Sequence, residues 1–405
     1  MVKHILNIAY YEVLHILKDP ILFLIVFVVP ALYAGIFGVV YYSAAITDIP
    51  VGIVNQDNSR LSRQVVEAFS HDSHFRVVKS VDTYSELKEG MQEGIVRAGV
   101  VIPENFESRV SQHRPAELLT IYDGSNLIWG FNTRKNMMEV VNQFSSTYTA
   151  GYLAGLSMTK NEIKNVMDTV SLNMEVWYNP TYSYVIFMFM GLMMMVVHQI
   201  GFLSVGLTVT REKERNCWIQ YLSAPVSRGK IIIGKCLPYL VMNFFNYTLL
   251  LWISANLIHA KIEGSVLCIV LLGILYDIII TFAGFFISVH APNSLQVTRY
   301  LLLISVPLFM ISGYTWPTRY IPPVLNAIAD LFPTTWMING FRLATVKNFG
   351  LAEMMPTIGV MLVMAAGAVG LAYTFRKDRK LSATGLTVNC GNVYPRRAFV
   401  FLRPK

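Results

Sequence analysis

The motif closest to a catalytic one is a near-match to the phosphate-binding loop of nucleotide hydrolases. The stretch Gly229-Lys-Ile-Ile-Ile-Gly234-Lys235-Cys236 differs at one position from G-x-x-x-x-G-K-[ST], in which backbone amides hold phosphates and the hydroxyl binds Mg²⁺. Cys236 lacks that hydroxyl, no strand-like pattern precedes Gly229, and the stretch runs directly into a long apolar segment. We therefore predict that this chain is not an enzyme and has no cofactor-binding, catalytic or metal site of its own, and that the two lysines mark the end of a membrane span.

Among the polar side chains inside the long apolar segments, four are candidates for a role there: His198, Asn243, Asn246 and Asp277. An ionised carboxylate in mid-membrane is costly, so Asp277 either belongs to a functional site or is a hydrogen-bonded carboxyl that fixes helix packing. The two asparagines are expected to form hydrogen bonds between helices. A membrane-embedded hydrolase using His198 and Asp277 would also need a nucleophile, and the sequence contains no recognisable nucleophile motif.

The composition explains why these residues must be positioned by membrane helices. The chain has 405 residues, of which 54% are hydrophobic and only 14% charged, whereas soluble domains carry about 25% charged residues. This excludes a soluble enzyme and a nucleic-acid binder as the main interpretation. Six apolar stretches are long enough to cross a bilayer as helices. They cover residues 20–43, 183–209, 230–256, 265–289, 299–314 and 355–375.

The distribution of charge predicts the orientation of these spans. With an even number of spans, both termini lie on one side, and the segments on that side carry 17 basic and five acidic residues, against 16 basic and 19 acidic on the other. The positive-inside rule therefore places both termini in the cytoplasm and residues 44–182 outside it. Residues 377–405 are expected to form a basic cytoplasmic tail near anionic lipid.

The large external segment has the pattern of a small α/β domain. Short β-rich runs alternate with polar stretches of helical period, and the segment contains no cysteine. The β-rich runs begin at Pro50, Phe75, Ala98 and Leu118. Residues 126–173 favour long helices, which we interpret as a stalk that returns the chain to the second span.

Three further segments are predicted at the membrane surfaces. Residues 1–19 form a candidate amphipathic helix at the inner interface, with an apolar stripe through Leu6, Tyr10, Val13 and Leu17. Residues 211–223 place alternating charges directly after a span and then apolar residues, which suits either a short lever that contacts a cytoplasmic partner or an ordinary positively charged loop. Residues 315–350 contain prolines and tryptophans between apolar runs too short to cross, and we expect a re-entrant hairpin at the outer leaflet.

Motifs along nearly the whole chain resemble those of the membrane subunits of ABC-2 type transporters, which are exporter-type permeases with a large extracytoplasmic domain between spans one and two. Each motif alone is unspecific, whereas their order and spacing together are specific. Where the family usually has Gly-Thr after the acidic cluster, this chain has Cys217-Trp218. The matching motifs are Glu12 to Asp19-Pro20, Val51-Gly-Ile-Val-Asn-Gln-Asp57, Gly99-Val-Val-Ile-Pro103, Tyr178-Asn179-Pro180, Arg211-Glu-Lys-Glu214, Ala224-Pro225, Ser312-Gly313 and Phe332-Pro333.

The resemblance implies a dimer with a second copy or a sibling permease, in which each membrane subunit is seated on a separate ABC ATPase subunit that binds ATP and Mg²⁺. The N-terminal helix and the loop between spans two and three would contact that ATPase. In this loop, charged residues would orient the contact and apolar residues would fill a groove on the partner. The candidate coupling residues are Arg211, Glu212, Glu214, Arg215, Trp218 and Leu222. A periplasmic adaptor is a further candidate partner.

We therefore expect an α-helical integral protein of the cytoplasmic (inner) membrane, with six transmembrane helices and an inserted extracytoplasmic α/β domain. Its first span is residues 20–43, and residues 183–376 form a five-helix transmembrane region. The expected function is that of a permease in an ATP-driven exporter of a hydrophobic or amphipathic drug, lipid or lipid-linked compound. The alternative is a membrane-anchored receptor or assembly scaffold whose external domain binds a partner.

Overall fold

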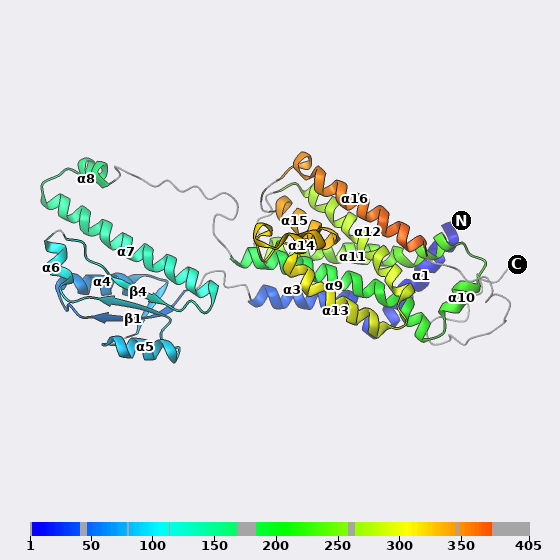
Figure 1. Ribbon diagram of the computed structural model, residues 1–405, viewed down its shortest axis with the longest axis horizontal. Coiled ribbons are helices and arrows are strands. Elements are labelled where there is room, and N and C mark those ends of the chain that lie inside the picture. The colour runs from blue at the N-terminus through cyan, green and yellow to red at the C-terminus, as the bar shows by residue number, and fades with distance from the viewer. Residues whose placement is uncertain are drawn as a thin grey trace. The chain divides into compact units, whose positions relative to one another are not determined.

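The computed structural model describes residues 2–40, 47–78, 81–112, 114–167, 184–257, 264–345, 347 and 349–374. The chain divides into two compact units, coloured in Figure 1 along the sequence. One is helical and contains residues 1–42 and 177–405, and the other contains residues 43–176. The predicted basic tail, residues 377–405, lies outside the described residues.

The helical unit contains six helices, among the described residues, that are long and apolar enough to cross a membrane. Their positions match the six stretches expected from the sequence. The first span is made of α2 (Pro20–Phe23), a π-helical turn (Leu24–Val28) and α3 (Val29–Val40). The other five are α9 (Tyr184–Glu214), α11 (Arg228–Leu257), α12 (Val266–His290), α13 (Ser294–Ile311) and α16 (Leu351–Tyr373).

The start of the first span is defined by its local sequence. The helix α1 (Val2–Lys18) precedes it, and Asp19 separates the two. The Asp19 carboxylate accepts hydrogen bonds from the backbone N–H groups of Ile21 (3.1 Å) and Leu22 (3.2 Å), and Pro20 occupies the first helical position. This N-cap and N1 proline are the usual signals that start a new helix.

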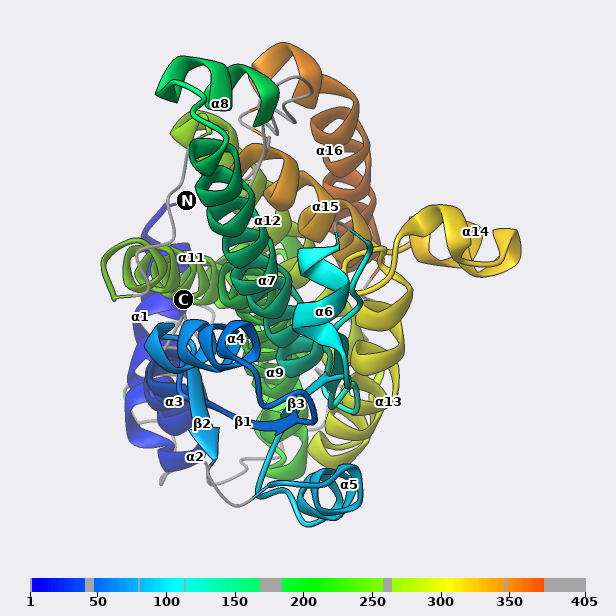
Figure 2. The same cartoon turned by 90° about the vertical axis from the view of Figure 1, so that its left-hand side faces the viewer.

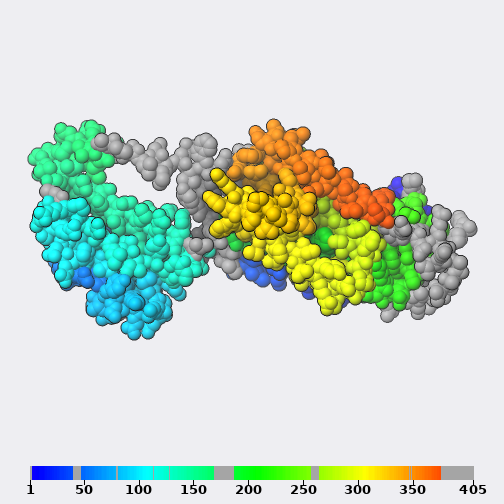
Figure 3. Space-filling view, viewed as in Figure 1, coloured from blue at the N-terminus to red at the C-terminus, as the bar shows by residue number. Residues whose placement is uncertain are grey.

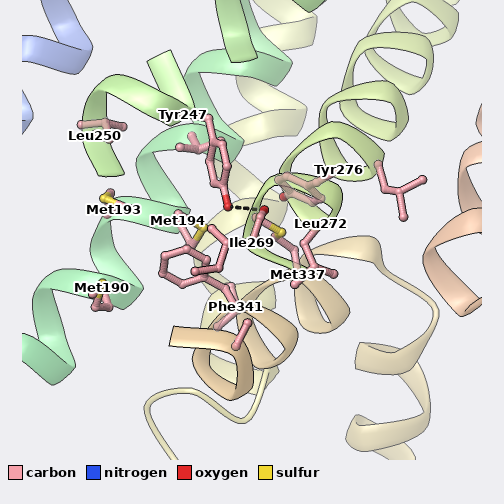
Figure 4. Packing of buried hydrophobic residues seen from close by; sticks show 14 of the residues in the cluster. Met190, Met193, Met194, Tyr247, Leu250, Ile269, Leu272, Tyr276, Met337 and Phe341 are labelled. Carbon is pink, nitrogen blue, oxygen red and sulfur yellow. Dashed lines mark hydrogen bonds between the residues drawn. The ribbon is translucent and has the colours of Figure 1, made fainter. Parts of the chain in front are cut away.

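The core of the helical unit lies where α12 packs against α9, α11, α16 and the short helix α15 (Pro333–Thr345). A Cβ atom on Gly273 would lie 2.2 Å from the Tyr247 ring, so only glycine allows α11 and α12 to approach this closely. The Tyr247 hydroxyl donates to the Ile269 carbonyl at 2.9 Å. Figure 4 shows the side chains that converge there: Met190, Met193, Met194, Tyr247, Leu250, Ile269, Leu272, Tyr276, Met337 and Phe341.

Between α13 and α16 the chain forms short helices rather than a span. These are a 3₁₀ turn (Thr318–Tyr320), α14 (Pro323–Asp330) and α15. Each of α14 and α15 begins at a proline, and with 8 and 13 residues both helices are too short to cross a bilayer. Trp316 and Tyr320 are exposed. The segment predicted as a hairpin, residues 315–350, therefore contains a pair of short helices. Exposed aromatic side chains precede the first of them.

The second unit is an α/β fold built on a four-stranded sheet of order β2-β1-β3-β4. The central strand β1 is parallel to β2 and β3, and β4 is antiparallel to β3. All four strands coincide with the β-rich runs of the sequence. The strands are β1 (Ile49–Asn55), β2 (Phe75–Val78), β3 (Ala98–Ile102) and β4 (Leu119–Tyr122), and the helices are α4 (Arg60–His71), α5 (Tyr84–Gln92), α6 (Phe106–Ser111), α7 (Leu127–Gly155) and α8 (Lys160–Met167).

Helices cover both faces of this sheet. One face packs against α4 and α7 in a single apolar cluster, and the other packs against α5 through Leu87. Figure 2 shows α4 and α5 on opposite sides of the strands. Strands buried on both faces need the near-continuous apolar runs that the sequence contains. The long helix α7 begins where the sequence predicts a stalk. However, Met137 and Val140 of this helix pack in the core of the sheet.

Candidate functional site

The most unusual feature of the helical unit is a buried cluster of charged side chains where α1, α9 and α11 meet. The Lys235 ammonium of α11 lies 2.8 Å from a carboxylate oxygen of Glu12 in α1 and 2.7 Å from one of Glu212 in α9. All three side chains are at most 1% exposed. The cluster therefore joins the N-terminal helix to the ends of two membrane spans.

Further polar groups complete the surroundings of Glu12. The hydroxyls of Tyr239 (3.0 Å) and Thr208 donate to one carboxylate oxygen, and His15 Nδ1 lies 3.9 Å from it. Burial by itself would raise the pKa of Glu12, but the positive charge of Lys235 holds that pKa well below its usual value. A buried charge with this many partners is stabilised only while all of them stay in place.

A second set of ion pairs lies at the end of α1. Asp19, which caps the first span, forms ion pairs with Arg211 in the last turn of α9 and with Arg215 (3.3 Å), the residue that follows α9. Partial burial would raise the pKa of Asp19, but the hydrogen bond from Arg211 and those from the backbone lower it below its usual value. The N-terminal helix and the first span are thus both held by the end of α9.

The end of α9 is also fixed to the connection between α12 and α13. Lys213 donates to the carbonyls of Ser288 (3.3 Å) and Ala291 (2.9 Å), and Glu214 accepts a hydrogen bond from the backbone of Ser294 (2.7 Å). A cation at the end of one helix and an anion at the start of the next both complement the helix dipoles. This end of the bundle is therefore a continuous network across five helices.

Residues 211–223, expected as one coupling helix, form two helices with a break between them. The helix α9 ends at Glu214 and α10 covers Trp218–Ser223. Asn216 adopts a left-handed conformation (φ 57°), and the N–H groups of Asn216 and Cys217 donate to the carbonyls of Lys213 and Glu212. This is the hydrogen-bond pattern of a Schellman stop, and asparagine is one of the few residues that tolerates it.

The six candidate coupling residues occupy different environments. Arg211, Glu212, Glu214 and Arg215 belong to the networks above. Trp218 is 5% exposed and packs, with Tyr221, in an apolar cluster between α1, α9 and α11. Leu222 packs against the edge of the same cluster. In this conformation most of these side chains contact their own chain.

Sequence reasoning missed the central members of the site, Glu12 and Lys235. Glu12 lies outside the apolar stripe predicted for the N-terminal helix, yet it is fully buried, whereas Leu6, Tyr10 and Leu17 of that stripe are exposed. Glu12, His15 and Asp19 recur at helical spacing on one face, and this signal could have identified the cluster.

Glu12, His15 and Glu212 could also reach one metal ion, because their ligand atoms lie within 4.8 Å of one another. However, the Lys235 ammonium already lies within hydrogen-bond distance of both carboxylates. Lysine therefore supplies the positive charge that a metal would otherwise supply.

Two of the four polar residues singled out within the spans, Asn243 and Asp277, interact with each other, and the other two have separate partners. His198 Nδ1 lies 2.7 Å from the Tyr276 hydroxyl, and the Asn246 amide donates to the Val26 carbonyl of the first span at 2.9 Å. Asn243 lies 3.5 Å from the Ser204 hydroxyl. Asp277, which follows Tyr276 in the sequence, accepts a hydrogen bond from the Thr281 hydroxyl (3.3 Å).

Asp277 has no cation within 4.0 Å among the described residues, although it is only 6% exposed. Asp277→Asn is expected to leave thermal stability and transport nearly unchanged, because the amide keeps the size and the hydrogen bond. Asp277→Leu is expected to destabilise the protein by about 1–3 kcal/mol, since Thr281 loses its acceptor. Loss of transport in a stable Asp277→Asn protein, together with loss of the pH dependence of wild-type transport, would instead indicate a role for the carboxylate in transport.

The lowered pKa values of Glu12 and Asp19 predict how acid affects the site. Both carboxyls stay ionised to lower pH in the folded protein than in the unfolded chain. Their stabilisation is therefore fully present above their usual values of 4.5 and 3.8, and it is lost as the pH falls through the lower folded values. The part of the thermal stability that depends on these two carboxyls is therefore expected to be constant down to about pH 5 and to fall below about pH 4. A Glu12→Gln, Asp19→Asn variant should be less stable at pH 7 and less sensitive to acid.

Comparison with known proteins identifies the family. The profile of the ABC-2 family transporter proteins matches residues 21–374, which is most of the chain. The chain belongs to the ABC-2 transporter family. This ABC-2 permease is a multi-pass membrane protein, as the family membership and its six apolar helices together indicate.

Similar proteins cover this permease almost from end to end. The probable multidrug ABC transporter permease YbhS of Escherichia coli K12 is 22% identical over 91% of this chain and 95% of its own length. Its counterpart YbhR is 24% identical over 82% of this chain and 87% of its own length. The linearmycin resistance permease protein LnrN of Bacillus subtilis is 21% identical over 90% of this chain and 97% of its own length.

Proposed function

We propose that this ABC-2 permease is the membrane subunit of an ATP-driven exporter that moves a hydrophobic or amphipathic compound out of the cytoplasm or the inner leaflet. The observation that carries the proposal is the buried Glu12–Lys235–Glu212 cluster. It makes α1, α9 and α11 one mechanical unit at the end of the bundle that carries the most positive charge. A force applied to α1 or α10 would reach the spans directly.

The ATPase in this proposal is a separate subunit, and it holds ATP and Mg²⁺. Its contact surface would be formed by the exposed side of α1 and the α9–α10 break, where Arg215, Asn216 and Ser223 are exposed and Ile219 is half-buried. Exposed charges would orient the encounter, and the apolar groups would supply affinity. The Lys235 ammonium lies 4.8 Å from the centre of the Tyr221 ring, so α10 is linked to the charged cluster.

The names of similar proteins support the proposed substrate class, and the outer surface of the spans suits the proposed membrane partners. The outer face of α13 exposes Leu302, Leu303, Val306 and Met310, which suits contact with hydrocarbon or with a second permease. Relatives are named as multidrug or linearmycin resistance permeases, which favours a hydrophobic cargo. The second permease would be another copy or a sibling chain, and a periplasmic adaptor would act on the α/β unit.

The coupling surface can be tested with a charged substitution. Ile219→Asp is expected to reduce ATPase co-purification by about tenfold or more, because a half-buried apolar contact becomes a charge. Tyr320→Asp is the matched control, since Tyr320 is an exposed hydrophobic residue outside the proposed contact. Equal ATPase recovery and equal substrate-stimulated ATP hydrolysis in both variants would overturn the coupling assignment.

The proposed topology places residues 44–182 outside the cytoplasm of an inner-membrane protein whose termini are both cytoplasmic. Ser125 is exposed in the α/β unit, and Ser227 is exposed at the start of α11. Cysteine at position 125 is expected to react with an impermeant thiol reagent in intact cells, whereas cysteine at 227 should react only after the membrane is opened. The opposite pattern would reverse the topology.

A receptor or assembly scaffold is the second candidate, and one observation favours it. An open groove of about 580 Å³ in the α/β unit runs along α7 beside α6 and β4. Its lining includes Arg114, Met138 and Tyr148. A scaffold would lose its activity when Met138 is changed to a charged residue but would keep it in Ile219→Asp. An exporter that depends on the ATPase would lose its activity in Ile219→Asp.

A further inference from the structure

A cavity of about 230 Å³ lies within the helical unit between α9, α12, α13 and the start of α15. Its walls are almost entirely apolar, and none of its lining residues carries an aspartate, glutamate, lysine or arginine side chain. Figure 3 shows α13 (yellow) on the surface of the unit. The apolar wall includes Phe202, Ile280, Ala283, Leu301 and Leu308.

Two hydroxyl groups in this wall make no hydrogen bond of normal geometry among the described residues, although the Thr334 hydroxyl interacts with that of Tyr276. Ser305 of α13 is 2% exposed, Thr334 of α15 is 3% exposed, and both line the cavity. Buried hydroxyls normally donate to a nearby carbonyl. Neighbouring side chains do so: Thr335 donates to Ala329 at 2.8 Å and Thr345 to Phe341 at 2.7 Å. Ser305 therefore holds an unused donor at the edge of an apolar space, and Thr334 holds a donor whose contact with the Tyr276 hydroxyl lacks normal hydrogen-bond geometry.

The start of α15 also favours a hydrogen-bond acceptor in the cavity. Phe332, Pro333 and Thr334 line the cavity. Phe332 directly precedes α15, and Pro333 and Thr334 are its first two residues. The positive end of a helix dipole favours a negative or electron-rich atom. Because no charged residue lines the cavity, the group that fits is a neutral acceptor oxygen rather than an anion.

We propose that this cavity binds an apolar segment of the exported compound, with a carbonyl or ether oxygen of that compound accepting hydrogen bonds from Ser305 and Thr334. The proposal rests on the proposed export function and identifies a substrate site for it. The cavity is smaller than the ~300–1,000 Å³ of sites that enclose a whole drug-sized ligand. It therefore takes one part of an elongated amphipathic molecule while the remainder lies outside.

Photolabelling of the full-length permease in lipid nanodiscs, without the ATPase, tests the site. The first probe is dodecanamide with a terminal alkyl diazirine, and the second is dodecane with the same diazirine. We expect the amide to label peptides of α13 and α15. The Ser305→Ala, Thr334→Val variant should reduce this labelling about three- to tenfold, the loss expected for one or two hydrogen bonds. Labelling by the hydrocarbon probe should change less than about twofold.

Two variants control for structural effects. Thr298→Val removes a hydroxyl of α13 that already donates to Ser294 and lies outside the cavity, so labelling should match the wild type. Ala283→Phe fills the cavity and should abolish labelling by both probes. The Ser305→Ala, Thr334→Val protein should unfold close to the wild-type temperature, because Ser305 has no partner to lose and Thr334 loses only its contact with the Tyr276 hydroxyl.

Equal amide labelling of the wild type and the double hydroxyl variant would overturn the proposal. Stronger labelling of the same peptides by a phospholipid with a diazirine in its acyl chain would also overturn it, because the cavity would then be a lipid site. Failure of the export function would be recognised separately, as absence of an ATPase from the purified wild-type complex. The binding assay does not depend on that subunit.

Discussion

Lys235→Met is expected to destabilise the protein by about 3–5 kcal/mol, because it removes the ammonium that lies between two buried carboxylates. Glu12 and Glu212 lie within 2.8 Å of the Lys235 ammonium and have almost no access to water. The thermal unfolding midpoint in micelles and the rate of proteolysis at α1 would report the loss. We expect α1 to detach first, since Glu12 is its main buried polar contact with α11.

The matched control for this variant is Lys230→Met, one and a half turns earlier on α11. Lys230 forms no ion pair among the described residues, so its replacement should cost less than about 0.5 kcal/mol. Glu12→Gln and Glu212→Gln, added to Lys235→Met, should recover most of the stability because no buried charge is then left unpaired. Equal stability of the two single lysine variants would show that the cluster contributes nothing.

Trp218→Ala is expected to lower stability by about 3–5 kcal/mol, because it opens a cavity in the apolar cluster beneath α10. The Trp218 side chain is 5% exposed and packs near Ile8, Val209 and Ile232. Trp218→Phe should retain much of the packing, and Leu222→Ala should cost less because Leu222 is only partly buried. The thermal unfolding midpoints of the three variants would test this order of stability.

This prediction also separates two roles of Trp218. If the residue acts inside its own chain, Trp218→Phe will be stable and will bind the ATPase normally. If it instead contacts the ATPase, Trp218→Ala will fold as stably as the wild type and lose only ATPase recovery. The coupling role of Trp218 therefore stays a prediction until stability and binding are measured on the same preparations.

The six spans were predictable from the sequence because the bilayer imposes a one-dimensional requirement. About 20 apolar residues are needed to cross it as a helix, and this pattern is local. The four strands of the α/β unit were predictable for a similar reason, since buried parallel strands read as short continuous apolar runs. Asp19-Pro20 also marked the start of the first span through local capping chemistry.

The composition of the charged site was decided only by the tertiary structure. Glu12 and Lys235 are 223 residues apart, and each has an ordinary local explanation, as the polar face of an interfacial helix or as a positive residue at a span end. Only the packing of α1 against α11 buries both and makes each the partner of the other. Ion pairing depends on distance in space, so no local pattern could reveal it. The same reason applies to Ser305 and Thr334, whose hydroxyls face one cavity only because α13 and the start of α15 meet there.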